Sequence, residues 1–113
     1  VPALAIRRPT AIVDADPKVT ERARKVIEHL AASKSPAGLS ESERKRFTPQ
    51  WITIVADEIN SAGPLGSVEL LAHSSDGDSK SFRYRFRFQN ETIILSLKLG
   101  ATETIEHLGI SLE

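Results

Sequence analysis

The sequence predicts an α+β domain in which two to three N-terminal helices pack on a curved four-stranded antiparallel sheet. Apolar residues recur at helical spacing in the first half of the chain, and aspartate or threonine followed by proline opens two of these segments. After position 66 the apolar spacing becomes twofold, which is typical of strands. Helices with one apolar stripe and strands with one apolar face both need a partner, so we expect the helices to cover one face of the sheet.

The first predicted helix begins at Asp16-Pro17, because aspartate is a preferred N-cap and proline suits the first helical position. Its apolar stripe consists of Val19, Ala23, Val26, Ile27 and Leu30. Residues 1–15 contain two prolines and no sustained period. We therefore expect an extended lead-in or linker over 1–15 and a single domain over 16–113.

Two further helices are predicted before the sheet. Ser40 and Glu43 fit a capping box, which favours a short helix from Ser40 to Phe47. Thr48-Pro49 repeats the signal of a cap followed by proline and opens the third helix. The apolar face of that helix is expected to carry Trp51, Ile52, Val55 and Ile59.

Four strands are predicted over 67–73, 80–89, 92–99 and 104–112, with the turn SSDGDS between the first two. In the second and third strands, apolar side chains alternate with polar ones. We expect the apolar set to face the helices; it comprises Phe82, Tyr84, Phe86, Phe88, Ile93, Leu95, Leu97 and Leu99. The intervening arginines are then expected to face solvent or a partner surface.

Composition excludes several classes of function. The chain has 113 residues, no net charge and no cysteine, so disulfides, thiolate metal sites and cysteine nucleophiles are excluded. No apolar run approaches the ~20 residues of a membrane span. The chain begins with Val1 and contains no methionine, which indicates a part of a longer protein.

Four segments resemble the nuclear-transport-factor-2-like (cystatin-like) cone fold over about residues 17–112: Phe47-Thr48-Pro49, Gly63-Pro64-Leu65-Gly66, Tyr84-Arg85-Phe86-Arg87-Phe88 and His107-Leu108-Gly109-Ile110. More narrowly, the chain looks like small accessory domains appended to bacterial serine β-lactamase-like or other hydrolases. The resemblance implies a multidomain bacterial protein, and a periplasmic or secreted location is compatible with it. Fold analogy alone does not imply a reaction.

The cone fold implies a pocket between the sheet and the helices. In related enzymes of the ketosteroid isomerase and polyketide cyclase type, this pocket holds an acidic base and a hydroxyl donor. The candidate residues for such a pocket are Tyr84, Trp51, Phe86, Leu97 and His107. The Tyr84 hydroxyl would donate to a ligand, or alternatively Tyr84 is a core aromatic whose hydroxyl reaches the rim. No carboxylate is clearly placed inside, which counts against isomerase chemistry.

A second candidate site is the polar face of the predicted sheet, where Arg83, Arg85, Arg87 and Lys98 lie on neighbouring strands. These side chains suit phosphate groups or an acidic surface. Aromatic residues that would stack nucleic-acid bases point the other way, so no nucleic-acid partner is expected. The three histidines, His29, His73 and His107, lack metal-ligand spacing. Neither a metal nor a cofactor is expected.

Together these observations favour a non-catalytic accessory domain of a larger bacterial protein, which binds a neighbouring domain or a small apolar ligand. The alternative is a small isomerase- or cyclase-like enzyme with a pocket between sheet and helices. We expect a monomer or a weak homodimer, because the arginines on the outer face would repel one another across a dimer interface.

Overall fold

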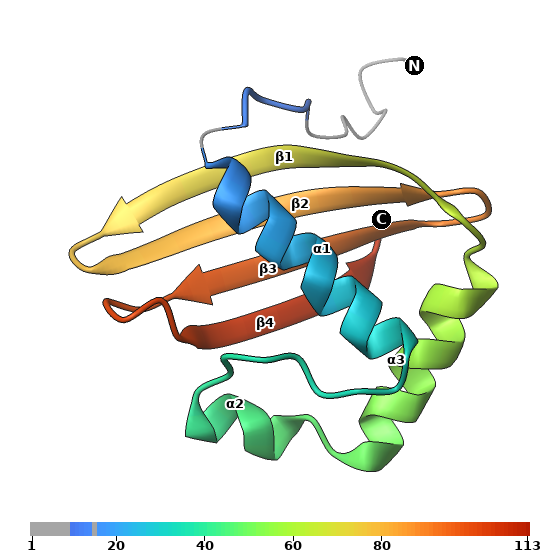
Figure 1. The fold of residues 1–113 in the computed structure, drawn as a ribbon. Helices are drawn as coiled ribbons and strands as arrows, with labels where there is room; N and C mark the ends of the chain where they lie inside the picture. The colour runs from blue at the N-terminus through green and yellow to red at the C-terminus, as the bar shows by residue number, and fades with distance from the viewer. Residues whose placement is uncertain (1–9, 15) are drawn as a thin grey trace, which may run out of the picture.

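A computed structural model describes residues 10–14 and 16–113 of the chain; the rest of the expected lead-in lies outside the described residues. Three helices precede four strands, which confirms the predicted α+β fold (Figure 1). The helices are α1 (Pro17–Ala31), α2 (Glu41–Arg46) and α3 (Pro49–Ser61). The strands are β1 (Leu65–Asp76), β2 (Ser79–Phe88), β3 (Thr92–Leu99) and β4 (Ile105–Leu112).

Each helix begins with the capping hydrogen bond that its sequence predicts. The side chains of Asp16, Ser40 and Thr48 accept hydrogen bonds from backbone N–H groups in the first turns of α1, α2 and α3. Proline follows the cap in α1 and α3. The five residues of the predicted α1 stripe are all buried. On α3 the fully buried positions are Ile52, Ala56 and Ile59, whereas Trp51 and Val55 are half-buried.

The strands form one antiparallel meander in the order β1-β2-β3-β4. Only Gly77 and Asp78 separate β1 from β2, so the predicted six-residue turn was too long. Gly77 has a φ of +62°, which a tight hairpin turn needs and glycine adopts without strain. Ser74 and Ser81 still pair in register near this tip, although both are polar. An exposed hairpin tip has no buried face, so the twofold apolar pattern that marks a strand is absent there.

Two of the three register shifts in the sheet set which side chains share a face near the β1–β2 hairpin. The register of β1 against β2 shifts between Leu70 and Ala72, which leaves Leu71 without an opposite residue. Beyond this bulge His73 lies opposite Phe82, and their rings stack with centroids 6.4 Å apart. A second shift follows Lys98, so that Leu99 pairs with Ile105.

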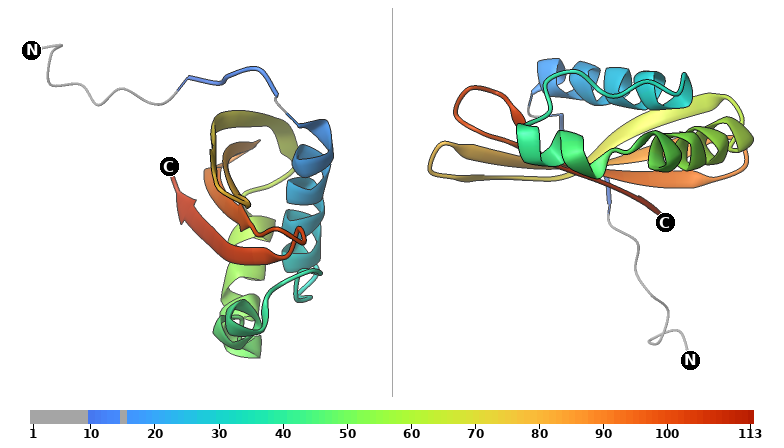
Figure 2. Two further views of the ribbon diagram at one scale, coloured as in Figure 1. Left: turned by 90° about the vertical axis from the view of Figure 1, so that its left-hand side faces the viewer. Right: turned by 90° about the horizontal axis from the view of Figure 1, so that it is seen from below.

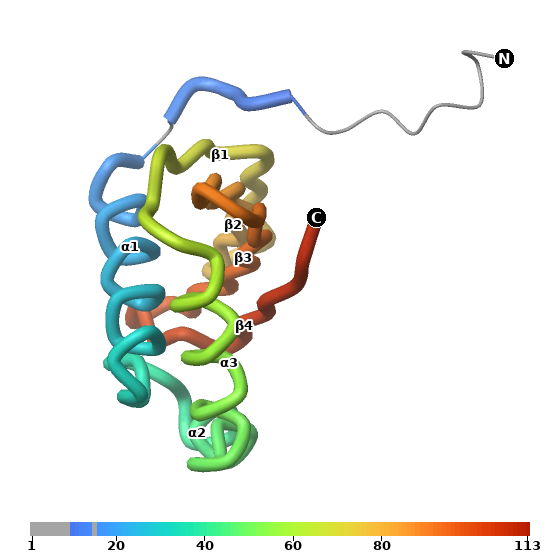
Figure 3. Tube along the Cα trace, turned by 90° about the vertical axis from the view of Figure 1, so that its right-hand side faces the viewer, coloured from blue at the N-terminus to red at the C-terminus, as the bar shows by residue number. Residues whose placement is uncertain are grey.

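The helices cover one face of the sheet, and we call the opposite face the free face (Figure 2). Aromatic and aliphatic side chains of the strands pack against the helices. The most deeply buried include Tyr84, Phe86, Leu95 and Ile105, which have no exposed surface. Helix α1 runs along one side of the strands, and α2 lies at the end of the molecule farthest from β1 (Figure 3). None of the described helices is long and apolar enough to cross a membrane.

Candidate functional site

Three of the five predicted pocket residues belong to the solid core. Tyr84 and Phe86 have no accessible surface, and Leu97 is 2% exposed. A side chain with no accessible surface leaves no room for even a water molecule beside it. Trp51 is half-buried and makes an edge contact with Phe47, their ring centroids 4.5 Å apart. The structure therefore does not bring the five residues together around one open space. His107 lies on the other face of the sheet, where His107 and Leu97 both line a groove.

The Tyr84 hydroxyl has partners within the protein. Thr20 Oγ1 lies 3.2 Å from Tyr84 Oη and 2.9 Å from each carboxylate oxygen of Asp14. Burial raises the pKa of Tyr84, and the carboxylates of Asp14 and Asp16 act in the same direction. Tyr84 is thus a core aromatic whose hydroxyl reaches the rim at the start of α1, the second of the two roles considered for it.

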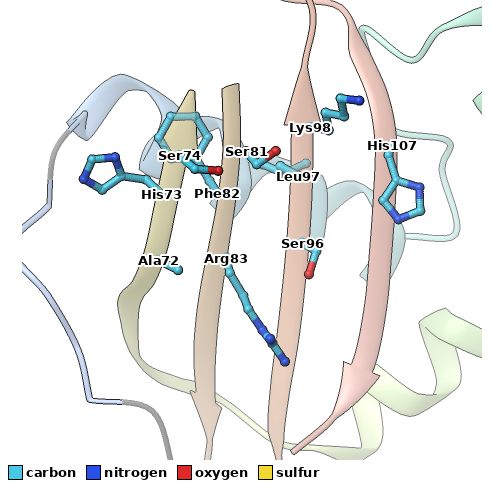
Figure 4. Close-up of a pocket in the computed structure, with 10 residues that line it drawn as sticks. All are labelled: Ala72, His73, Ser74, Ser81, Phe82, Arg83, Ser96, Leu97, Lys98 and His107. Carbon is cyan, nitrogen blue, oxygen red and sulfur yellow. The ribbon is translucent and has the colours of Figure 1, made fainter. Parts of the chain in front are cut away.

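The free face carries an open groove of about 290 Å³ near the β1–β2 hairpin (Figure 4). Strand pairing aligns two rows of side chains across it. The first row runs Ala72, Arg83, Ser96 and Gly109. The second row runs Ser74, Ser81, Lys98 and His107. Both rows combine small residues with one long cation each, and the small residues form the floor of the groove. We call this site the free-face groove.

The two cations of the free-face groove lie apart from each other. The Arg83 side chain extends along the strands away from Lys98, and Ser96 lies between the two cations (Figure 4). The three serine hydroxyls that line the groove are hydrogen-bond donors that suit an anion. The His73 ring points away past β1, so this residue lines the groove only with its backbone side (Figure 4).

His107 adds a further polar group from β4. Its Nδ1 lies 3.4 Å from a guanidinium nitrogen of Arg46. Its Nε2 lies on the Gly109 side, where a Cβ added to the glycine would be 3.4 Å away. The Nε2 atom is therefore placed over the first row of the groove.

The four basic residues predicted as a surface site separate into two pairs. Arg83 and Lys98 are exposed, and neither makes an ion pair within the described part of the chain. Arg85 and Arg87, in contrast, bind carboxylates: Arg85 Nη2 is 2.7 Å from Glu113 Oε2, and Arg87 Nε contacts Glu69 Oε1. No carboxylate lines the free-face groove, so its positive charge is not neutralised locally.

The prediction that Arg85 faces solvent was wrong. Arg85 is 2% exposed, although it lies on the free face beside Ile94. Its hydrogen bonds to Glu113 raise the pKa of Arg85 despite its desolvation, and they satisfy the guanidinium in the absence of water. Arg85 is thus a buried structural cation and no surface for a partner.

The geometry of the free-face groove suits binding of an anion better than catalysis. The two cations and three hydroxyls can donate hydrogen bonds, and none of the three serines is hydrogen-bonded to His73 or His107 in the described part of the chain, so no serine is paired with a base. The described residues also hold no cluster of three or more histidine and acidic side chains that could bind a metal ion. Ser74 was missed because it falls within the predicted turn, whereas Ser81 lies in a predicted strand but was not predicted as a site residue. The pairing of the two residues across the hairpin is the signal that places them together.

Comparisons with known proteins do not assign a family. A scan against models of protein families finds no match, and a search of curated proteins finds no significant relative.

Proposed function

We propose that the chain is a non-catalytic binding domain of a larger bacterial protein, and that it binds an acidic segment of a neighbouring domain in the free-face groove. The observation that carries the proposal is a groove that, among the described residues, is lined by two cations without ion pairs, three serines and no carboxylate. Two cations and three hydroxyl donors are complementary to carboxylate or phosphate oxygens. The resemblance to accessory domains of bacterial hydrolases supports the part of the proposal that places the chain in a larger bacterial protein.

The basic residues of the free face differ in whether a carboxylate neutralises them, and this difference supports a role in binding for one half of the face only. Glu69 and Glu113 neutralise the two arginines nearer the β2–β3 hairpin. The same face leaves Arg83 and Lys98 without such partners among the described residues. A partner that supplies negative charge would therefore gain favourable electrostatic energy at this half of the face.

A small apolar ligand and an isomerase-type reaction are both less well supported. Each would need space beside the inward-facing aromatics, and Tyr84 and Phe86 have no accessible surface. The carboxylate nearest to the Tyr84 hydroxyl, Asp14, reaches it only through Thr20. We therefore do not propose either function.

The first prediction tests the free-face groove directly. Hexaglutamate peptide and inorganic phosphate would be titrated against the protein, with amide chemical shifts as the readout. We expect shifts centred on Ser81, Ser96 and Lys98, and weaker binding as salt screens the charges. The double substitution Arg83→Ala with Lys98→Ala is expected to weaken peptide binding about tenfold or more.

The matched control is Arg87→Ala, which removes an equally basic side chain whose charge Glu69 already balances. It should change affinity by less than about twofold. Both substituted sites are exposed, so thermal unfolding should stay close to that of the unmodified protein. Equal affinity of the double variant and the unmodified protein would overturn the proposal, as would shifts that appear elsewhere on the surface.

A further inference from the structure

The outer edge of β4 is covered over only half of its length. Ile105 exchanges backbone hydrogen bonds with the segment before α2: its N–H donates to Gly38 O at 2.7 Å, and Ser40 N–H donates to its carbonyl at 2.9 Å. One step further, Leu108 N–H donates to the Glu43 carboxylate at 3.0 Å. These contacts close the edge from Ile105 to Leu108.

Beyond Leu108 the edge is open. Alternate residues of an edge strand direct their N–H and C=O groups outward. Leu108 directs its N–H outward to Glu43, whereas Glu113 N–H donates inward to Thr92 O at 3.1 Å. Ile110 and Leu112 share the phase of Leu108, so their N–H groups also point away from β3. The backbone hydrogen bonds of the described residues include no partner for either group on that side.

An apolar groove of about 280 Å³ lies next to this open edge, and we call it the edge groove. It is lined by α3, the start of β3 and the end of β4: Ile54, Val55, Glu58, Ile59, Ile93, Ile110, Ser111 and Leu112. Ile54 is 67% exposed and Leu112 is 55% exposed. Large aliphatic side chains that gather around free backbone donors are typical of a strand-docking site.

Two carboxylates lie at the Leu112 end of the edge groove without a cation. Glu58 lines the groove, and Glu91 lines the adjoining depression that also contains Leu112. Neither makes an ion pair with a described residue, and Glu91 Oε2 is shielded from solvent with no donor. Hydrogen bonding with Glu58 raises the pKa of Glu91, because two carboxylates can share a hydrogen bond only when one is protonated.

We propose that the open half of β4 binds an extended segment of a partner protein as a fifth strand, with apolar side chains on the face toward α3 and a basic residue at the end of that same face. Its backbone would pair with Ile110 and Leu112. Its apolar side chains would enter the edge groove, and a lysine or arginine would neutralise Glu58 and Glu91. This site is separate from the free-face groove and does not depend on the function proposed for it.

A second copy of the chain fits this edge less well than a basic segment. Pairing of two β4 edges about a twofold axis would bring together two sets of the same carboxylates, with no cation among the residues that line the edge groove. A basic strand instead supplies the charge that the site lacks, and it satisfies the outward N–H groups equally well.

The second prediction uses a blocked nine-residue peptide with lysine at both ends, valine at positions three, five and seven and threonine between them, so that lysines and valines share a face. The matched peptide has glutamate in place of both lysines. We expect the lysine peptide to bind at least about tenfold more tightly, which corresponds to one well-placed charge contact. Binding should slow hydrogen exchange at the amides of Ile110 and Leu112. The double substitution Glu58→Gln with Glu91→Gln should remove the preference between the two peptides.

Three variants separate strand docking from unspecific attraction. Leu112→Pro removes an outward N–H without breaking the ladder to β3, and it should abolish binding. Ile54→Asn should weaken binding about tenfold, because it replaces an aliphatic wall of the groove. Val13→Asn is the matched control, since Val13 is an 89% exposed aliphatic residue outside the groove, and it should change nothing.

Equal binding of the two peptides would overturn the proposal, and so would unchanged exchange at Ile110 and Leu112 in the complex. Sedimentation of the chain alone tests whether a second copy of the chain occupies this edge instead. A dimer that Ile54→Asn converts to monomer would identify a second copy at this edge and would also overturn it. The Arg83→Ala, Lys98→Ala variant should bind the lysine peptide normally, so failure of the free-face proposal would be seen separately.

Discussion

At the residue scale, the Tyr84 hydroxyl joins the sheet to the start of α1. Its ring has no accessible surface, and Thr20 Oγ1 lies 3.2 Å from the phenol oxygen. Thr20 is also within 2.9 Å of Asp14, so the hydroxyl belongs to a short polar chain that ends at an exposed carboxylate. A phenol in this position is stabilised in its neutral form, since ionisation would place a negative charge in an apolar site near two carboxylates.

The third prediction concerns Tyr84→Phe, which should lower the free energy of unfolding by about 0.5–1.5 kcal/mol near neutral pH through loss of one hydrogen bond. The difference from the unmodified protein should shrink at alkaline pH. Burial raises the pKa of Tyr84 above its ordinary value of 10.0, so the folded state retains the proton more strongly than the unfolded state. The resulting stability is complete below about pH 10 and is lost as pH rises through the folded pKa.

Urea unfolding of both proteins between pH 8 and pH 11 measures this difference at each pH, and titration of the lysines cancels in the comparison. A gap that stays constant across this range would contradict the role of burial. Since Tyr84 does not contact an open cavity, the substitution should leave binding at the free-face groove unchanged.

At the element scale, Glu43 connects α2 to the edge of the sheet. Its carboxylate accepts a hydrogen bond from Leu108 N–H at 3.0 Å and from Arg46 at 2.7 Å, and only 5% of the residue is exposed. Ser40 and Glu43 predicted a capping box, and the Ser40 half is present because its hydroxyl accepts from Glu43 N–H. The glutamate side chain does not complete the capping box and instead accepts the N–H of Leu108 at the edge of β4. The sequence of the helix alone gives no indication of this partner.

The fourth prediction is that Glu43→Ala lowers the free energy of unfolding by about 1.5–3 kcal/mol, the usual range for a hydrogen bond to a charged group. The Leu108 amide should then exchange faster with solvent. Glu43→Gln keeps an acceptor and should cost less. Glu41→Ala, at an exposed position of the same helical turn, should cost less than about 0.5 kcal/mol. Unchanged protection of the Leu108 amide in Glu43→Ala would show that this contact does not hold α2 to the sheet.

The elements themselves could be predicted from the sequence where apolar residues repeat on one face and where caps mark an end. This holds for α1, α3, β2 and β3. It fails at the tip of the β1–β2 hairpin, where β1 continues from Ser74 to Asp76 without any buried face. It also fails at Leu71, because a bulge inserts one residue into an otherwise regular alternation. The free-face groove depends on both features, so its basic residues could be predicted but the arrangement of its floor could not.

At the scale of the whole molecule, the sheet buries side chains on both faces. The main core lies below the helices, yet Leu71 and Ile94 are 7% and 4% exposed and do not belong to that cluster. Ile94 lies opposite Arg85 and shares its face. The stem of a long arginine can cover aliphatic neighbours, and curvature of the strands brings side chains on a concave face together. Twofold alternation alone assigns Ile94 to the solvent side, because it does not encode how strongly a sheet bends.

The fifth prediction tests this second packed face by comparing adjacent residues that point in opposite directions. Ile93→Ala removes a fully buried side chain from the main core and should cost about 2–5 kcal/mol. Ile94→Ala should fall in the same range, although an exposed position on a free face would cost less than about 0.5 kcal/mol. Chemical unfolding of both variants, with exposed Val13→Ala as the reference, decides between these values. A small effect of Ile94→Ala would mean that the free face is open to water around Arg85. The Arg85–Glu113 pair would then be a solvated ion pair of little energetic weight, whereas a large effect makes this face a second structural layer that holds the free-face groove in shape.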